Sequence, residues 1–242
     1  MMEKLSIEEK IKCFDNNFGR IKEQLLASAT ASGRSVDDII LLAATKTVPV
    51  EVINYAIDKG LSYIGENRVQ EFISKYDNLK PCTRHFIGHL QTNKVKDIID
   101  KVDMIQSVHS LKLAKEISKQ AARVEKNMQI LIEVNIGREE SKSGFFEEEL
   151  HDAVCEIAKL DNLQVMGLMA IPPICDNNEQ LKNYFLKMHK LFVEIQTKNL
   201  YNVNMVYLSM GMSEDFPLAV ACGANMVRIG SALFGKRNYN IK

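Results

Sequence analysis

The feature that most constrains the fold is a repeated alternation of short apolar segments with longer amphipathic ones. The apolar segments have the length of β-strands, and they are 39–46, 62–67, 85–90, 104–110, 128–136, 163–171, 204–211 and 226–235. Continuous apolar strands that alternate with helices are typical of a parallel sheet buried on both faces. Eight such units in about 200 residues predict a single-domain (β/α)8 TIM barrel.

Helical patterns connect these strands, and one more precedes them. The connecting segments are 50–60, 68–76, 93–99, 111–126, 146–160, 178–198 and 215–223. Residues 7–31 form an additional amphipathic segment, with apolar side chains three and four positions apart, that ends before Gly33. We therefore expect one domain over 1–242, with an N-terminal helix in 1–38 and the barrel in 39–242.

A doubly wound open sheet is the alternative fold for this alternation. Its dinucleotide-binding fingerprint, G-x-G-x-x-G after the first strand, is absent, and "ATKTVPV" occupies that position at 44–50. The chain also stops soon after the eighth strand, which leaves no room for a second domain. Both observations favour the barrel.

Composition and charge exclude several classes of protein. Lys and Arg total 31, as do Asp and Glu, so no net charge favours nucleic acid or an anionic membrane. The five cysteines are scattered and never form a CxxC pair, which argues against a zinc site or a disulfide framework. The N-terminus has no apolar signal segment, and no stretch approaches the ~20 apolar residues of a membrane span. We expect a cytoplasmic protein without a metal.

Polar side chains gather where the predicted strands end. In a barrel of this kind the active site lies at the C-terminal ends of the strands. The polar or small residues at those ends are Lys46, Glu66, Asn67, His85, His89, Ser107, His109, Glu133, Asn135, Ser209, Ser213, Arg228, Gly230 and Ser231. This rim is where we expect the functional site.

Lys46 is the central candidate. Because side chains alternate along a strand, an inward-facing Lys46 would share its face with Ala44 and Leu42, and the small Ala44 would leave space beside it. Burial disfavours a charged amine, and a neutral lysine can attack an aldehyde to form a Schiff base. Taken alone, however, this residue is better explained as a strand-end lysine in contact with solvent.

The eighth strand strengthens the functional interpretation. Arg228 and Gly230 lie two residues apart, and Gly230 and Ser231 open a turn whose N–H groups and hydroxyl suit a phosphate. Ser213 either adds a donor to that site or caps the helix at 215–223, and the sequence does not distinguish the two. A buried Arg228 needs an acceptor, which is either Glu133 or the ring nitrogen of a ligand.

With these residues in place, the chain resembles the pyridoxal 5'-phosphate homeostasis protein family, also called the YggS/PROSC family, whose members resemble the N-terminal barrel of alanine racemase. The resemblance covers nearly the whole chain. It rests on the blocks "ATKTVP", "IGENRVQE", "HFIGHLQTNK", "SVHS", "IEVNIGREESKSGF", "GLMAIPP" and "LSMGMSEDFPLAVACGANMVRIGSALFG".

The resemblance implies a cofactor and a set of residues that bind it. It implies that Lys46 carries pyridoxal 5'-phosphate (PLP) as an internal aldimine and that Arg228 faces the pyridine nitrogen. It also places a phosphate near Ser213, Gly230 and Ser231. Ser209 and Asn67 are implied to line the same site.

This cofactor site lacks the usual features of a catalytic one. An arginine cannot accept a proton, so it leaves the pyridine nitrogen unprotonated and makes the ring a weak electron sink. Racemisation also needs a second base across the ring, which alanine racemase-like enzymes take from an additional C-terminal domain. We therefore expect a non-catalytic monomer that buffers PLP and delivers it to PLP-dependent apo-enzymes.

Two enzymes are the alternatives, and one further lysine is of interest. A fold-type III amino-acid racemase would use the same cofactor, and a Schiff-base aldolase would use Lys46 alone but gives Arg228, Gly230 and Ser231 no role. The histidines at the strand ends are expected to be structural, and two of them without a third ligand make a poor metal site. Lys142, in the loop "REESKSGF", is a candidate second amine for the cofactor's aldehyde.

Overall fold

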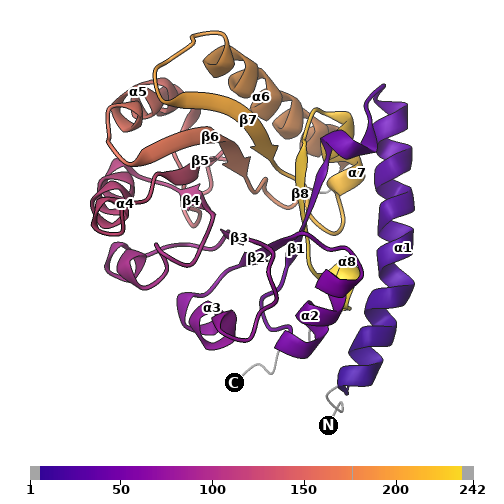
Figure 1. The fold of residues 1–242 in the computed structure, drawn as a ribbon. Helices are drawn as coiled ribbons and strands as arrows, with labels where there is room; N and C mark the ends of the chain where they lie inside the picture. The colour runs from indigo at the N-terminus through magenta and orange to yellow at the C-terminus, as the bar shows by residue number, and fades with distance from the viewer. Residues whose placement is uncertain (1–5, 176, 236–242) are drawn as a thin grey trace.

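A computed structural model describes residues 6–175 and 177–235. In this part of the chain eight parallel strands pair in sequence order, and β1 pairs with β8 to close a barrel (Figure 1). The strands are β1 (Ile40–Ala44), β2 (Tyr63–Glu66), β3 (Thr83–Phe86), β4 (Met104–Val108), β5 (Met128–Val134), β6 (Leu163–Ala170), β7 (Val203–Ser209) and β8 (Met226–Ile229). The predicted (β/α)8 barrel is confirmed, and the predicted outer limits of the domain, residues 1 and 242, lie outside the described residues.

Helices surround the barrel and connect its strands. They are α1 (Ile7–Ala31), α2 (Val50–Asp58), α3 (Val69–Tyr76), α4 (Leu111–Arg123), α5 (Glu147–Ala158), α6 (Asn178–Gln196), α7 (Phe216–Ala221) and α8 (Ser231–Phe234), with 3₁₀ segments η1 (Val36–Asp38) and η2 (Thr92–Asp97). Local chemistry starts several of them: Ser110 accepts a hydrogen bond from Leu113 N, and Asn177 accepts one from Gln180 N. Within the described ranges, no helix is both long enough and apolar enough to cross a membrane.

Three predicted segments differ from the structure. The helix expected at 93–99 is the 3₁₀ segment η2, in which Ile98 N–H bonds to the Val95 carbonyl three residues back. The strand expected at 85–90 is β3, which ends at Phe86. The chain that follows lies close to the loop after β2, because a Cβ added to Gly88 would lie 2.1 Å from the Asn67 backbone oxygen. The strand expected at 226–235 ends at Ile229, because α8 begins there.

The core has an inner and an outer layer, as strand alternation requires. Outward-facing residues such as Ala43, Ile64 and Phe86 belong to the large apolar cluster shared with the helices. Inward-facing Leu42, Ala44, Ile87 and Met226 pack together inside the barrel, and a second inner cluster contains Met104, Leu131, Met166 and Met169. The interior is therefore packed below the strand ends, and open space is left at its mouth.

The N-terminal helix α1 packs against α2, α7 and α8, so it joins the two ends of the barrel sequence (Figure 1). Phe14 is fully buried there, stacked between Phe18 and Phe234 and in edge contact with Tyr55. Asn17 Nδ2 adds a 3.1 Å hydrogen bond to the Leu233 carbonyl. This aromatic cluster fixes α8 and, with it, the loop that follows β8.

We expect Phe14→Ala to destabilise the protein by about 3–5 kcal/mol, because it removes a large side chain from a filled aromatic cluster. Urea unfolding followed by circular dichroism measures this loss. Leu26→Ala on the same helix is the matched control, because Leu26 is 52% exposed and its truncation should change stability by less than ~0.5 kcal/mol. Equal losses in the two variants would contradict the proposed packing.

Candidate functional site

The predicted residues come together at the C-terminal ends of β1, β2, β7 and β8. Parallel pairing sets Leu42 opposite Arg228 and Ala43 opposite Ile229, so the turns after these two strands are neighbours. Lys46 is not in the strand, because β1 ends at Ala44; it is half-buried in the turn that follows. Lys46, after β1, and the Gly230–Ser231 turn, after β8, therefore flank one edge of the barrel mouth, and Arg228 lies deeper, within β8.

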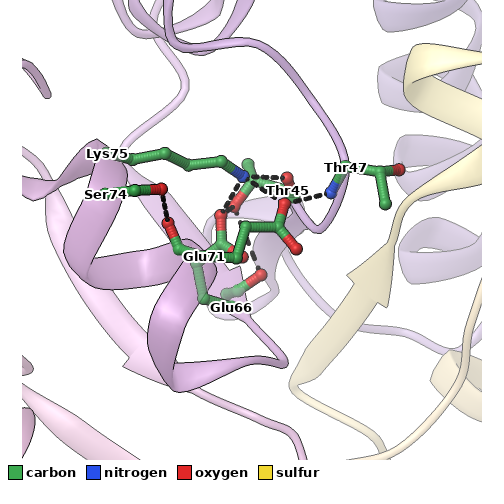
Figure 2. Close-up of polar contacts among 7 residues, drawn as sticks. Thr45, Thr47, Glu66, Glu71, Ser74 and Lys75 are labelled. Atoms are coloured by element: carbon green, nitrogen blue, oxygen red, sulfur yellow. Dashed lines mark hydrogen bonds and ion pairs between the residues drawn. The ribbon is translucent and has the colours of Figure 1, made fainter.

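A buried network holds the turn that carries Lys46 (Figure 2). Thr45 is 0% exposed, and its hydroxyl donates a 2.8 Å hydrogen bond to Glu66 Oε1. Lys75 Nζ, on α3, donates to the Thr45 carbonyl at 2.9 Å, to Glu66 Oε1 at 2.8 Å and to Glu71 Oε1 at 2.7 Å. Glu71 in turn accepts a hydrogen bond from Thr47 N. Both residues that flank Lys46 are thus fixed by one lysine and two carboxylates.

Two carboxylates, Glu66 and Glu71, share one cation, Lys75, in this network. Glu66 is only 1% exposed, and burial raises the pKa of its carboxyl while the charge of Lys75 opposes the increase. Thr47 also adopts a left-handed backbone with φ of 64°, which its hydrogen bond to Glu71 supports. The sequence predicted no role for Lys75 or Glu71, because a Glu–Lys pair four residues apart is usually an exposed helix pair.

Arg228 is buried inside the barrel and its charge is satisfied by neutral groups. Nη1 donates to the Ser209 carbonyl at 2.8 Å and to Ser209 Oγ at 2.7 Å, and Nη2 donates to the Ala170 carbonyl at 2.9 Å. Burial lowers the pKa of this guanidinium to about 10, so it stays protonated at neutral pH. Glu133, one of the two acceptors expected from the sequence, influences Arg228 through its charge, while Ser209 and Ala170 supply the hydrogen bonds.

A chain of buried side chains crosses the barrel behind Arg228. Ser209 Oγ donates to Gln106 Oε1 at 2.7 Å, and Gln106 Nε2 lies 2.7 Å from His85 Nδ1. Burial lowers the pKa of His85 to about 4, so the ring is neutral and Nδ1 can accept. Ser209 is fully buried, so in the structure it supports Arg228, and its predicted contact with a cofactor stays a prediction.

Ser213 joins the loops after β7 and β8. Its hydroxyl oxygen accepts hydrogen bonds from Gly230 N at 3.3 Å and Ala232 N at 3.1 Å. One sequence alternative was that Ser213 caps the helix that follows it, at 215–223. In the structure its hydroxyl instead caps α8, which follows the neighbouring strand β8. Ser213, Gly230 and Ser231 are thus brought together as predicted, with donors at a helix start; their contact with a phosphate stays a prediction.

A cavity of about 440 Å³ opens beside this edge, across the mouth of the barrel. Its walls come from the end of β5 and from the loops after β2, β3, β5 and β6. They are formed by Asn67, Ile87, Gly88, His89, Glu133, Val134, Asn135, Ser141, Lys142, Ser143 and Ile171. Asn67 is the predicted site residue that lines it. Among the described residues, Asn67 Oδ1 and Glu133 Oε2 are buried with no hydrogen-bond partner.

Glu133 has an unusual acidity in this cavity. Burial raises the pKa of its carboxyl to about 7, although the positive charge of Arg228 opposes the increase. The carboxyl group therefore changes charge near neutral pH. A buried carboxyl with a pKa near 7 is suited to hold or release a proton.

The loop after β5 forms one wall of the cavity and is held from within. Asn135 is buried and its Nδ2 donates to the carbonyls of Glu139 and Lys142, at 2.9 and 3.2 Å. Lys142 Nζ forms an ion pair with Glu139 and contacts the carbonyls of Pro172 and Ile171, at 3.1 and 3.5 Å. The predicted encounter of Lys142 with a cofactor aldehyde stays a prediction.

The histidines at the mouth do not share a strand as the sequence suggested. His85 lies on β3 inside the barrel, whereas His89 lies in the following loop, because β3 ends at Phe86. The His89 ring stacks on His109 with centroids 4.5 Å apart, and His89 Nδ1 lies 2.9 Å from Ser143 Oγ. These contacts connect the loops after β3, β4 and β5.

Comparison with known proteins identifies close relatives. A model of the alanine racemase N-terminal domain matches residues 41–238. A pyridoxal phosphate homeostasis protein of Aquifex aeolicus is 46% identical over 91% of this chain and 96% of its own, and that of Escherichia coli K12 is 35% identical over 94% and 98%.

Solved structures agree with these sequence relatives. The structure of PipY of Synechococcus elongatus with PLP bound is 30% identical and superposes with a TM-score of 0.76, covering 89% of this chain and 100% of PipY. Alanine racemase of Clostridium difficile, at 18% identity and a TM-score of 0.67, covers 90% of this chain and 57% of its own and shows the fold alone.

We expect Lys75→Met to destabilise the protein by about 3–5 kcal/mol at pH 8, because it leaves a buried Glu66 carboxylate unpaired. Without the lysine the pKa of Glu66 rises further, so the loss should shrink as pH falls and Glu66 becomes protonated. Urea unfolding at about pH 5 and about pH 8 measures both effects.

Two controls accompany this variant. Glu66→Gln added to Lys75→Met should recover most of the loss, because no buried charge then remains. Lys80→Met breaks an exposed pair with Asp58 and should cost less than ~1 kcal/mol. A loss in Lys75→Met that is independent of pH would contradict the proposed role of the pair.

Proposed function

The chain belongs to the pyridoxal phosphate homeostasis protein family, and from that premise we propose that it binds PLP covalently on Lys46, buffers it and delivers it. PLP supplies an aldehyde that condenses with a primary amine, together with a pyridine nitrogen and a phosphate. The observation that carries the proposal is the buried Arg228. It lies on β8, the strand that pairs with β1, and its guanidinium is held by hydrogen bonds to Ser209 and Ala170.

The residues at this edge of the barrel match the three chemical groups of PLP. The Lys46 amine is half-buried in the turn after β1, which suits a covalent bond to an aldehyde. At the start of α8, Gly230 N and Ala232 N already donate to Ser213 Oγ. The hydroxyls of Ser213 and Ser231 and the Ser231 N–H are therefore the donors that suit a phosphate there. Arg228 lies deeper, where it supplies a donor to the pyridine nitrogen, and Asn67 Oδ1 is an available acceptor beside the site.

The buried network around Lys75 has a clear task in this proposal. Lys46 has a long side chain with four rotatable bonds, so a defined position of its amine requires a fixed backbone. Lys75, Glu66 and Glu71 fix Thr45 and Thr47, the residues on each side of it. They therefore position Lys46 without contacting the cofactor.

Arg228 limits what the site can do with PLP. Its guanidinium has only donors, and with a pKa of about 10 it keeps its own proton at neutral pH. A pyridine nitrogen held beside it would accept a hydrogen bond and stay unprotonated, and the ring would then be a weak acceptor of electrons from an amino-acid substrate. The site thus favours holding PLP over catalysis.

We further propose that PLP-dependent apo-enzymes receive the cofactor from this protein, which acts as a monomer. The support is chemical: a lysine-bound aldehyde can pass to another primary amine, and the site is open at the barrel mouth beside a cavity of about 440 Å³.

A fold-type III amino-acid racemase is the second candidate function, and one observation favours it. Glu133 lines the cavity with a pKa of about 7, which suits a general base or acid. In that case the protein would interconvert the enantiomers of an amino acid bound in the cavity.

We expect the PLP-treated protein to show a visible absorption band that borohydride bleaches, because reduction removes the conjugated bond to the amine. Lys46→Ala should abolish the band, since no other amine is held in that turn. Lys142→Ala, which removes a half-buried lysine at the same barrel mouth, is the control and should retain it. A band that survives in Lys46→Ala but is lost in Lys142→Ala would refute the proposed attachment.

The two candidate functions are separated by assays of racemisation with a panel of D- and L-amino acids. We expect no turnover above free PLP, because Arg228 leaves the ring a weak electron sink. Turnover that disappears in Glu133→Gln would establish the racemase in place of the homeostasis protein.

A further inference from the structure

We propose that the cavity beside the cofactor site binds the ammonium group of an alkylamine, such as a lysine side chain, between Glu133 and Asn67. The proposal deepens the proposed function, on which it rests, because it names the chemistry of the acceptor that removes PLP from Lys46. In that exchange the acceptor nitrogen would bond to the PLP carbon as the Lys46 nitrogen leaves it, and Glu133 would take the proton that the bound ammonium loses and return it to the departing Lys46 amine. The cavity shares Asn67 with the proposed cofactor site, and Glu133 has no assigned part in holding PLP in the proposed function.

The first argument is the pair of acceptors in the cavity wall. Glu133 Oε2 and Asn67 Oδ1 are buried and lack hydrogen-bond partners among the described residues. Buried acceptors of this kind are costly unless a donor reaches them. Both belong to residues that line one cavity, and a ligand there that presents several N–H donors suits two such acceptors best.

The second argument is the arrangement of charge around Glu133. Three other charged or titratable groups face this region: Arg228 from β8, His89 from the loop after β3, and Lys142 from the loop after β5. Arg228 directs its donors to Ser209 and Ala170, and His89 pairs with Ser143. Glu133 is thus not the hydrogen-bond partner of either group, and its charged form, which dominates above about pH 7, suits a cation.

The third argument concerns the part of the ligand that follows the amine. An α-amino acid would bring a carboxylate, which needs a free cation in the cavity. Lys142 does not offer one, because its Nζ is already engaged by Glu139 and by the carbonyls of Pro172 and Ile171. The apolar side chains of Ile87 and Ile171 line the same cavity and suit methylene groups instead.

The size of the cavity agrees with such a ligand. About 440 Å³ lies in the usual range for small-molecule pockets, and it holds an extended butylamine chain with room for water. A free alkylamine and the lysine side chain of a protein share this chemistry. The structure therefore assigns the cavity to alkylammonium recognition and disfavours amino acids.

Binding of n-butylammonium to the unloaded protein, measured by isothermal titration calorimetry, tests the proposal. We expect Glu133→Gln, which keeps the side-chain size, to weaken binding roughly tenfold or more, because it replaces a charge-assisted hydrogen bond with a neutral one. Glu140→Gln removes the same charge from an exposed residue of the neighbouring loop and should leave the affinity unchanged. Glycine should bind at least about tenfold more weakly than n-butylammonium.

The pH dependence of the wild-type protein gives a second readout that needs no variant. The pKa of Glu133 is about 7, whereas an alkylammonium stays charged up to about pH 10. The affinity should therefore be higher at about pH 8.5 than at about pH 5.5, and Glu133→Gln should lose that difference.

A comparison of acceptors shows whether the cavity serves free alkylamines or the lysine side chains of proteins. PLP release from the loaded protein should be accelerated by n-butylamine and by a lysine-containing peptide blocked at both ends, more than by glycine. Acceleration by n-butylamine but not by the peptide would assign the cavity to free amines.

Several outcomes would overturn the inference. Equal n-butylammonium affinity in wild type and Glu133→Gln, affinity independent of pH, or tighter binding of glycine would each refute alkylammonium recognition. Such results leave the proposed function intact if the loaded protein still shows its borohydride-sensitive absorption band. Loss of that band in the wild-type protein would instead refute the proposed function.

Discussion

The pairing of β1 with β8 is the contact on which the proposed site depends. It joins the first and last strands of the barrel, with Leu42 opposite Arg228, and so brings together two loops from opposite ends of the sequence. Helix α1 reinforces this closure, because Phe14 packs on Phe234 of α8 and Asn17 bonds to Leu233. The amine, the helix start and the guanidinium are neighbours only because the barrel closes at this point.

Two buried cations serve this edge of the barrel in different ways. Lys75 forms ion pairs with Glu66 and Glu71 and fixes the turn around Lys46, so its charge has a structural role. Arg228 has carbonyl and hydroxyl partners and keeps a charge that Asp215 and Glu133 balance in part through their own charges. In the proposed site the first arrangement positions the Lys46 amine, and the second holds Arg228 as a donor for the ligand.

The sequence predicted the fold well because its signals were strong and repeated. The alternation of strands and helices predicted the barrel. The polar residues at the strand ends predicted a site at the barrel mouth. It did not predict Lys75 and Gln106, because a helical Glu–Lys pair and a strand glutamine carry no local sign of burial. Nor did it predict that Ser213 caps α8 or that β3 ends at Phe86, since both depend on contacts between distant loops. The roles of residues that contact distant parts of the sequence can be identified only from the folded structure.

The measurement that tests the central claim most directly is the position of the covalent attachment. The PLP-treated protein is reduced with borohydride, digested, and its peptides are sequenced by mass spectrometry to locate the added pyridoxyl mass. The account predicts that this mass lies on Lys46, in the turn held by Lys75 and beside the β8 loop. A pyridoxyl group found only on other lysines, with Lys46 unmodified, would contradict it.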